Sequence, residues 1–348
     1  MATIVVCRML GGLSSAGGSV TLGMVADLYQ PDEQQWAVLF VVLSSVGGSV
    51  LGPVFGGLIQ FYIPTDPSWN FWIQLIFGVV VQIIHALLVP ETRTTVMLDK
   101  KARKLRKSEP EKYGNLYGPN EVKEKRLEMS ELVKVWYRPF QFFFTEPIVL
   151  CLSLLSGFSD ALIFTFLSAW GPIFEQWGFS VKGVGLAFIA IAIGYFPLGY
   201  FSFVPDIIQQ KRRFRREGYE NVPPERRLLY LLYLAPLEAI GLFGFAFTSY
   251  GPTLMPGTNT WIAPMIFAAL VGWANFAIYY ATIDYMVAAY GPYAASATGG
   301  NGFARDVLAG FAAFYAGKSL HRLFLPKSLN KSPTPLSKPG TNLRFPHI

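Results

Sequence analysis

The chain of 348 residues is unusually apolar: 52% of its residues are hydrophobic, 16% are aromatic and only 15% are charged. Soluble domains carry about 25% charged residues, so a soluble protein is excluded. The net charge of +7 comes from Lys and Arg gathered in two loops and the tail, which argues against nucleic-acid binding. Two cysteines and three scattered histidines exclude a disulfide framework and predict neither a metal site nor a cofactor.

Eight apolar segments are long enough to cross the roughly 30 Å hydrocarbon core of a bilayer as helices. They predict an all-α, polytopic membrane protein built as a helical bundle. The first segment could also be a secretory signal peptide, but it is rich in Gly and Ser and has no Ala-x-Ala cleavage site. In chain order the predicted spans are residues 4–28, 36–62, 70–89, 147–170, 183–205, 229–249, 261–287 and 294–316.

Basic residues orient these spans. Thirteen Lys and Arg lie in residues 91–146 and seven in residues 206–228, whereas residues 63–69, 171–180 and 250–260 have none. Cytoplasmic loops are enriched in Lys and Arg, so the two basic loops are predicted in the cytosol and the other three segments outside.

The long basic loop divides the chain. Residues 1–90 are expected to hold three spans and residues 147–317 five, in two helical bundles. Residues 91–146 are interpreted as a solvated cytosolic linker with some amphipathic helix, and lipid binding or regulation is the alternative. Residues 318–348 are rich in Pro, Ser and Lys and are expected to form a basic, disordered tail.

The second predicted span contains a regular glycine pattern. Gly48, Gly52 and Gly56 recur every four residues and leave one helix face bare, so a neighbouring helix could touch its backbone. Pro53 removes a helical hydrogen bond and should bend the helix, and Gly57 closes the pattern.

This stretch resembles the antiporter motif Gly-x-x-x-Gly-Pro-x-x-Gly-Gly in the fifth helix of major facilitator superfamily exporters. Residues 8–12 are similar to the Arg-x-x-x-Gly signature of the fourth helix, and residues 89–92 to the end of the sixth helix in fungal members. Residues 224–228 and 289–296 also resemble the fungal drug and polyamine proton-antiporter group. The resemblance covers residues 1–316 and equates the eight spans with helices four to eleven of twelve.

The resemblance implies a secondary active transporter that works as a monomer in the plasma membrane or, alternatively, the vacuolar membrane. It would exchange protons for small hydrophobic or cationic compounds: a drug, a polyamine or a secondary metabolite. The substrate would bind near the midplane, between two bundles that rock.

The sequence departs from the family pattern at both ends, so we expect an incomplete transporter. The family's first three helices have no counterpart here, and the tail stands where a twelfth helix is expected. A truncated, transport-incompetent member is therefore the main alternative. A membrane-embedded enzyme is less favoured, because the spans hold no cluster of paired carboxylates and only one histidine, His85.

Ionisable side chains at bilayer depth are costly, so they are candidates for function. Asp160 is predicted to lie among aromatic side chains and to recognise cations or couple protons; a polar contact with a neighbouring helix is the alternative. Arg8 and Arg305 match arginines of the family. The resemblance implies a role of Arg8 in proton coupling or substrate binding, and a structural ion pair or an interfacial position is the alternative. Asp306 follows Arg305, and the two side chains should point about 100° apart.

The remaining candidates could line a substrate cavity. The acids Glu238 and Asp284 could do so unless they lie close enough to a helix end to reach the headgroups. Asn275, Tyr279 and Asn301 could donate hydrogen bonds to a substrate, although tyrosines near helix ends are more often interfacial anchors.

Overall fold

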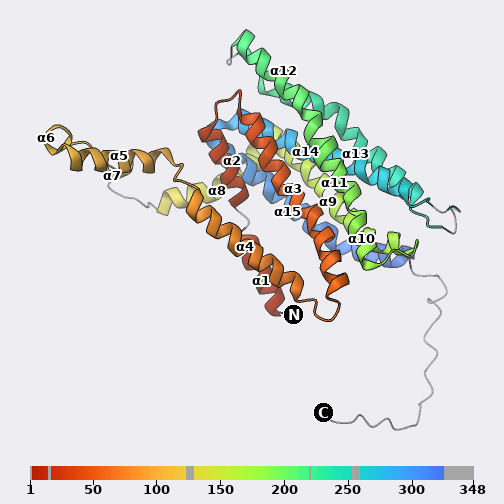
Figure 1. Cartoon of the computed structure of the whole chain (residues 1–348). Coiled ribbons are helices and arrows are strands. Elements are labelled where there is room, and N and C mark those ends of the chain that lie inside the picture. The colour runs from red at the N-terminus through yellow and green to blue at the C-terminus, as the bar shows by residue number, and fades with distance from the viewer. Residues whose placement is uncertain are drawn as a thin grey trace, which may run out of the picture.

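The computed structural model describes residues 2–14, 17–122, 129–218, 221–252, 257 and 259–324, and the regular structure in these ranges is helical. Figure 1 shows long helices packed side by side, with α5 projecting away from them. An all-α membrane protein is therefore confirmed. The predicted tail lies outside the described residues, apart from residues 318–324 at the end of the last helix.

The first group of helices contains the predicted spans of residues 1–90. The helix of the second predicted span is continuous through Pro53. The helix of the third predicted span has no buried residue, as expected of an apolar helix that faces lipid. The first predicted span consists of two helices, and residues 15–16 between them lie outside the described residues. The helices are α1 (Ala2–Ser14), α2 (Gly17–Leu28), α3 (Gln34–Tyr62) and α4 (Trp69–Leu88).

The predicted linker contains helices of its own: α5 (Thr94–Ser108), α6 (Pro110–Tyr113), α7 (Pro119–Val122) and α8 (Met129–Thr145). The last of these is not a free tether, because it packs against the following bundle. The rings of Phe140 and Phe303 lie 5.1 Å apart at their centroids, and the Tyr290 hydroxyl donates to Glu146.

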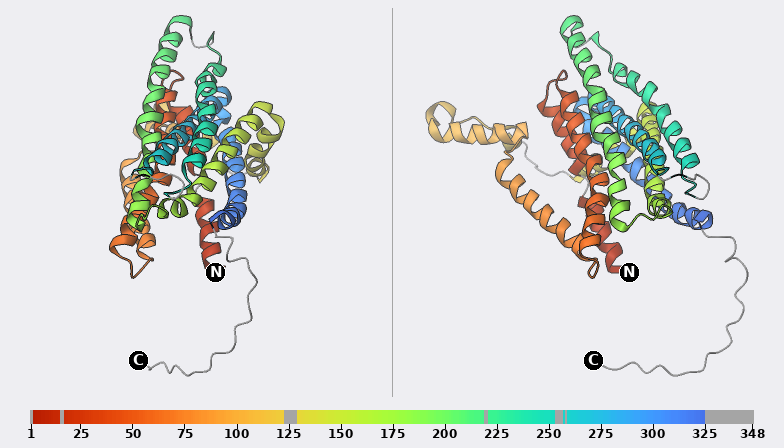
Figure 2. Two further views of the ribbon diagram at one scale, coloured as in Figure 1. Left: turned by 90° about the vertical axis from the view of Figure 1, so that its right-hand side faces the viewer. Right: turned by 45° about the vertical axis from the view of Figure 1, so that its right-hand side comes forward.

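The second group holds the core. Its central helix α14 has 18 buried residues, and it contacts α9, α13, α15 and, from the first group, α3 (Figures 1 and 2). The group consists of α9 (Pro147–Glu175), α10 (Val181–Ala187), α11 (Ile189–Ile193), η1 (Gly194–Tyr200), α12 (Phe201–Glu217), η3 (Pro224–Leu228), α13 (Leu229–Thr248), α14 (Ile262–Tyr290), η4 (Gly291–Tyr293) and α15 (Ala294–Phe324).

Two features of this group differ from simple spans. The predicted span 183–205 is a composite of α10, α11, the π-helix η1 and the start of α12, with Pro197 inside the π-helix. Within the described ranges, seven helical stretches are long and apolar enough to cross a membrane, and the last runs from Ile262 to Ala316. It holds both α14 and α15, which are separated at Gly291, where a φ of 40° interrupts the helix. The eight predicted segments are therefore all present as helices.

The two groups meet through a close contact of α3 with α10. A Cβ atom added to Gly57 would lie 2.9 Å from the Cα atom of Gly185, so only glycine fits there. The structure differs from the expected stripe, because a Cβ on Gly48 or Gly52 meets nothing within 4 Å among the described residues, and one on Gly56 meets only a distant side chain.

Candidate transport site

An ion pair between α9 and α15 forms the centre of the site. The Nη2 and Nε atoms of Arg305 lie 2.5 Å and 2.6 Å from Oδ2 of Asp160. The helices can approach because Gly157 stands one turn before Asp160: a Cβ there would lie 3.1 Å from the carbonyl oxygen of Ala304. A carboxylate with a bound guanidinium is a charge-assisted pair, which lowers the cost of placing both charges inside the bundle.

The guanidinium of Arg305 also lies on an aromatic ring. Its Cζ atom is 3.8 Å from the ring centroid of Tyr279 on α14, within the range of a cation–π contact. Arg305 is thus held by a carboxylate and by a ring face, whereas the neighbouring Asp306 is exposed, as the predicted angle between the two requires.

A chain of hydrogen bonds joins Asp160 to a second carboxyl group. Ser159 Oγ donates to Glu238 Oε1 on α13 at 2.7 Å, and Asn275 Nδ2 on α14 donates to Ser159 Oγ at 2.9 Å. The same amide nitrogen lies 3.4 Å from Asp160 Oδ1, and the Tyr195 hydroxyl of η1 donates to Asn275 Oδ1 at 2.8 Å. A change of charge at either carboxyl group can therefore alter the hydrogen bonds of the other through Ser159 and Asn275.

Glu238 differs from Asp160 in its partners. Its side chain is buried, and it has no ion pair with any described residue. Its one hydrogen bond in the described chain comes from Ser159. Burying a carboxylate without a cation is costly, so protonation or a nearby cation would stabilise this group.

Asn301 lies one turn before Arg305 on the same face of α15. Its Nδ2 atom donates to Ser156 at 2.8 Å and reaches Ser153 at 3.5 Å, while its buried Oδ1 atom has no hydrogen-bond partner in the described chain. The amide thus extends the polar surface between α9 and α15.

The aromatic residues expected around Asp160 lie on two faces of α9. Phe166 and Trp170 are buried and pack against Phe245 of α13, Phe166 at a tilt and Trp170 stacked. Phe158 and Phe164 are exposed and point away from the core, because they lie on the other face of α9. The buried aromatic cluster therefore lies further along α9 than Asp160, on the buried face of the helix.

Asp284 is not part of this site. The structure places it further along α14, where its Oδ1 atom lies 2.6 Å from Arg227 Nη1 and its Oδ2 atom accepts from Gln35 Nε2 at 2.9 Å. Asp284 belongs to a buried ion pair that joins η3, α14 and α3, and its role as a cavity residue stays a prediction.

The structure thus brings together five of the predicted residues, and Asn301 lies next to them. The five are Asp160, Glu238, Asn275, Tyr279 and Arg305. The side chain of Arg8 lies outside the described residues. Sequence reasoning missed Ser159 and Tyr195; the position of Ser159 beside Asp160, in a span, was the available signal.

Comparison with known proteins identifies the family. Residues 1–313 match the family model described as Major Facilitator Superfamily. The chain is 31% identical over 314 residues to the transporter paaT of Penicillium rubens, covering 88% of the chain and 54% of the relative. It is 32% identical over 315 residues to the efflux pump atB of Aspergillus terreus, covering 88% and 63%.

A third relative, the multidrug transporter TPO1_1 of Candida glabrata, is 28% identical over 328 residues, which are 92% of the chain and 54% of the relative. The chain thus spans little more than half the length of most of these relatives, and no solved structure matches it. The family model covers nearly all the described helices. This chain therefore belongs to the major facilitator superfamily.

Proposed function

We propose that the protein exports small hydrophobic or cationic compounds from the cytosol in exchange for protons. The observation that supports this proposal is a network in which two buried carboxyl groups are linked by hydrogen bonds, while only one of them, Asp160, has an ion-pair partner among the described residues. Asp160 holds Arg305, while Glu238 is linked to them only through Ser159 and Asn275.

The charge balance of this group suits exchange. With both carboxyl groups ionised, the site has one negative charge in excess, which either a proton or a monovalent cationic substrate can neutralise. Occupancy by both would leave the site with an excess positive charge, which is unfavourable in a medium of low polarity. A proton and a cation would therefore displace each other, which is the requirement for antiport.

Aromatic residues on the helices of the site support the same substrate class. Phe166, Trp170 and Phe245 form a buried aromatic wall on α9 and α13, the helices that also carry Asp160 and Glu238. Aromatic faces attract cations and bury hydrophobic groups. The relatives described as an efflux pump and a multidrug transporter favour export over the enzymatic alternative. We further propose that the protein acts as a monomer in the plasma membrane.

Transport by the 348-residue chain in proteoliposomes with an imposed proton gradient tests the proposal. Uptake of a lipophilic cationic dye into vesicles that are acidic inside should depend on the gradient and fall at least tenfold in Asp160→Asn and Glu238→Gln. Asp306→Asn is the matched control, since that acid is exposed. A folded chain without gradient-driven uptake would contradict the proposal and favour a transport-incompetent member.

A further inference from the structure

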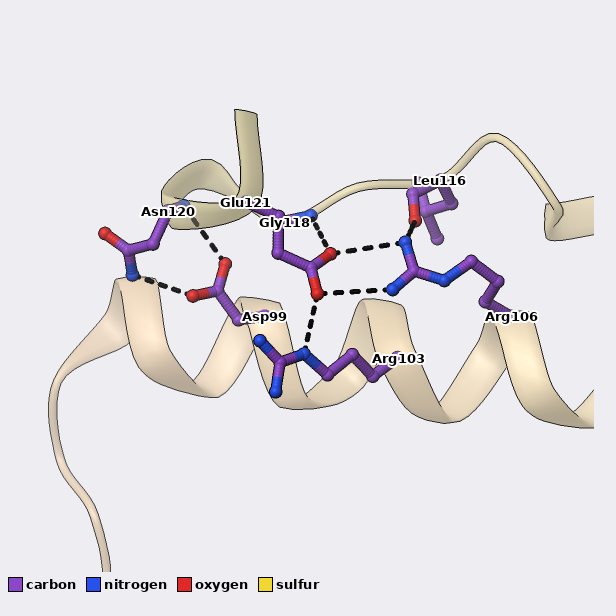
Figure 3. Close-up of polar contacts among 7 residues, drawn as sticks. All are labelled: Asp99, Arg103, Arg106, Leu116, Gly118, Asn120 and Glu121. Atoms are coloured by element: carbon purple, nitrogen blue, oxygen red, sulfur yellow. Dashed lines mark hydrogen bonds and ion pairs between the residues drawn. The ribbon is translucent and has the colours of Figure 1, made fainter. Parts of the chain in front are cut away.

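The linker contains a compact unit, here called the clasp, formed by α5 and α7. Glu121 on α7 accepts from Arg103 Nε at 2.6 Å, from Arg106 Nη2 at 3.2 Å and from the backbone nitrogen of Gly118 at 3.2 Å (Figure 3). Arg106 also donates to the carbonyl oxygen of Leu116 at 3.1 Å. One carboxylate therefore binds two arginines of α5 and fixes α7 against it.

A second carboxylate closes the other end of the clasp. Asp99 on α5 accepts from the backbone nitrogen of Asn120 at 3.1 Å and from its side-chain Nδ2 at 2.8 Å (Figure 3). A Cβ atom on Gly118 would lie 2.6 Å from the Cα atom of Asp99, so the approach requires glycine. Both carboxylates thus bind groups at the contact between α5 and α7.

The outer face of α5 carries lysines that have no ion-pair partner among the described residues. Met97, Lys101 and Lys104 follow one another at helical spacing, and Lys100 and Lys107 flank them. All four lysines are exposed, and none has an ion pair or hydrogen bond with a described residue. Asp99 binds Asn120 and Glu121 binds the two arginines, so neither carboxylate forms an ion pair with these lysines.

Helix α5 begins close to the end of a candidate membrane span. Helix α5 begins at Thr94, six residues after α4 ends at Leu88, and α4 is an apolar helix with no buried residue. Figure 1 shows α5 leaving the end of α4 and pointing away from the bundle. Among the described helices, its main contacts are with α6 and α7, so the bundle does not cover the lysines.

We propose that the lysine face of α5 binds the anionic lipid headgroups of the cytosolic leaflet. Charge complementarity supports this occupant, because that leaflet is negative and attracts basic segments beside a spanning helix, roughly fivefold in affinity per lysine. Met97 and Leu98 favour lipid over nucleic acid: they are 52% and 46% exposed beside the lysines, where their apolar ends can enter the headgroup boundary. The clasp occupies the two arginines and presents the lysines as one surface.

The test uses the whole chain in nanodiscs made of phosphatidylcholine with or without phosphatidylserine. A fluorophore is attached to Ser108→Cys, at the end of α5, in a chain carrying Cys7→Ser and Cys151→Ser. Quenching by headgroup-labelled lipid reports the approach of α5 to the bilayer. We expect quenching to be at least fivefold stronger with phosphatidylserine and to weaken as salt increases.

Replacing all four lysines with Gln should abolish the difference between the two lipids, whereas replacing them with Arg should preserve it. Lys112→Gln is the matched control, because that lysine is exposed on α6, outside the lysine face. Equal quenching in both lipids, or an unchanged difference in the Gln variant, would overturn the proposal. Measured protection of the α5–α7 amides in each variant shows whether the clasp is intact.

Discussion

Arg227 and Asp284 form an ion pair in which both side chains are almost completely buried, with exposed fractions of 3% and 1%. The Nη1 atom of Arg227 lies 2.6 Å from Oδ1 of Asp284, and its Nη2 atom donates to the carbonyl oxygen of Pro31 at 3.3 Å. Gln35 at the start of α3 donates to the other carboxylate oxygen. The pair therefore connects the two groups of helices, because Arg227 and Asp284 belong to the second group and Pro31 and Gln35 to the first.

Removing one member of this pair should destabilise the fold strongly. Arg227→Met or Asp284→Asn leaves the other polar group buried without its partner, at a cost of about 3–5 kcal/mol. The double variant should recover part of that loss, because no lone charge remains. Thermal unfolding of the purified chain in detergent measures each value.

The exposed pair Glu109–Lys112 is the matched control, and its removal should cost less than about 1 kcal/mol. Equal, small effects at both pairs would show that the Arg227–Asp284 ion pair does not stabilise the contact between the two groups of helices.

Packing of α3 should depend on Gly57 more than on the regular stripe before it. In Gly57→Leu the new side chain would meet the backbone of Gly185 and the carbonyl oxygen of Val181, which should cost at least about 1–3 kcal/mol and lower the abundance of the folded protein. Gly52→Leu is the control, because a side chain there enters open space in the described structure. Equal thermal stability of both variants would refute the contact.

The spans could be predicted from sequence because length and apolarity are local properties of a segment. Asp160 and Arg305 could likewise be selected, since a charge inside an apolar run is conspicuous. Their pairing could not, because 145 residues separate them and only the packing of α9 on α15 brings them together. The same limit applies to Asp284, whose partner Arg227 lies in a segment that reads as a cytosolic loop.

The linker shows a related limit. Residues 91–122 are predicted to form a solvated linker with some amphipathic helix, but the sequence does not predict that Glu121 and Asp99 hold α7 against α5 in the clasp. Charge composition alone does not reveal which side chains meet. The spacing of Arg103 and Arg106 on one face of a helix was the only local signal.

The geometry of Arg305 predicts that Lys cannot replace it. Lys has no planar group to lie on the Tyr279 ring, and it cannot offer two nitrogens to Asp160 in the same arrangement. Arg305→Lys should therefore reduce gradient-driven transport at least tenfold while the protein still folds. Tyr279→Phe keeps a ring under the guanidinium and should retain most activity, whereas Tyr279→Leu should not. Normal transport by Arg305→Lys would show that charge alone suffices.

The clasp should open in acid. Hydrogen bonds from Arg103, Gly118 and Arg106 lower the pKa of Glu121 to about 2, against an ordinary value of 4.5. A carboxyl group whose pKa is lower in the folded state stabilises that state fully above its unfolded pKa, and the stabilisation is lost as the pH falls toward the folded pKa. Protection of the α5–α7 amides should therefore be constant above about pH 5 and decline between about pH 4.5 and 2.

Hydrogen-exchange mass spectrometry of the 348-residue chain, with pulses after equilibration at each pH, measures this decline. Glu121→Gln removes the titrating group, so its clasp should be less protected at neutral pH and should lose most of the pH dependence between pH 4.5 and 2. Glu111→Gln is the matched control, because that acid is exposed on α6, and it should behave like the parent chain. If Glu121→Gln kept both the parental protection and the parental acid transition, the carboxylate of Glu121 would not be what holds α7 to α5.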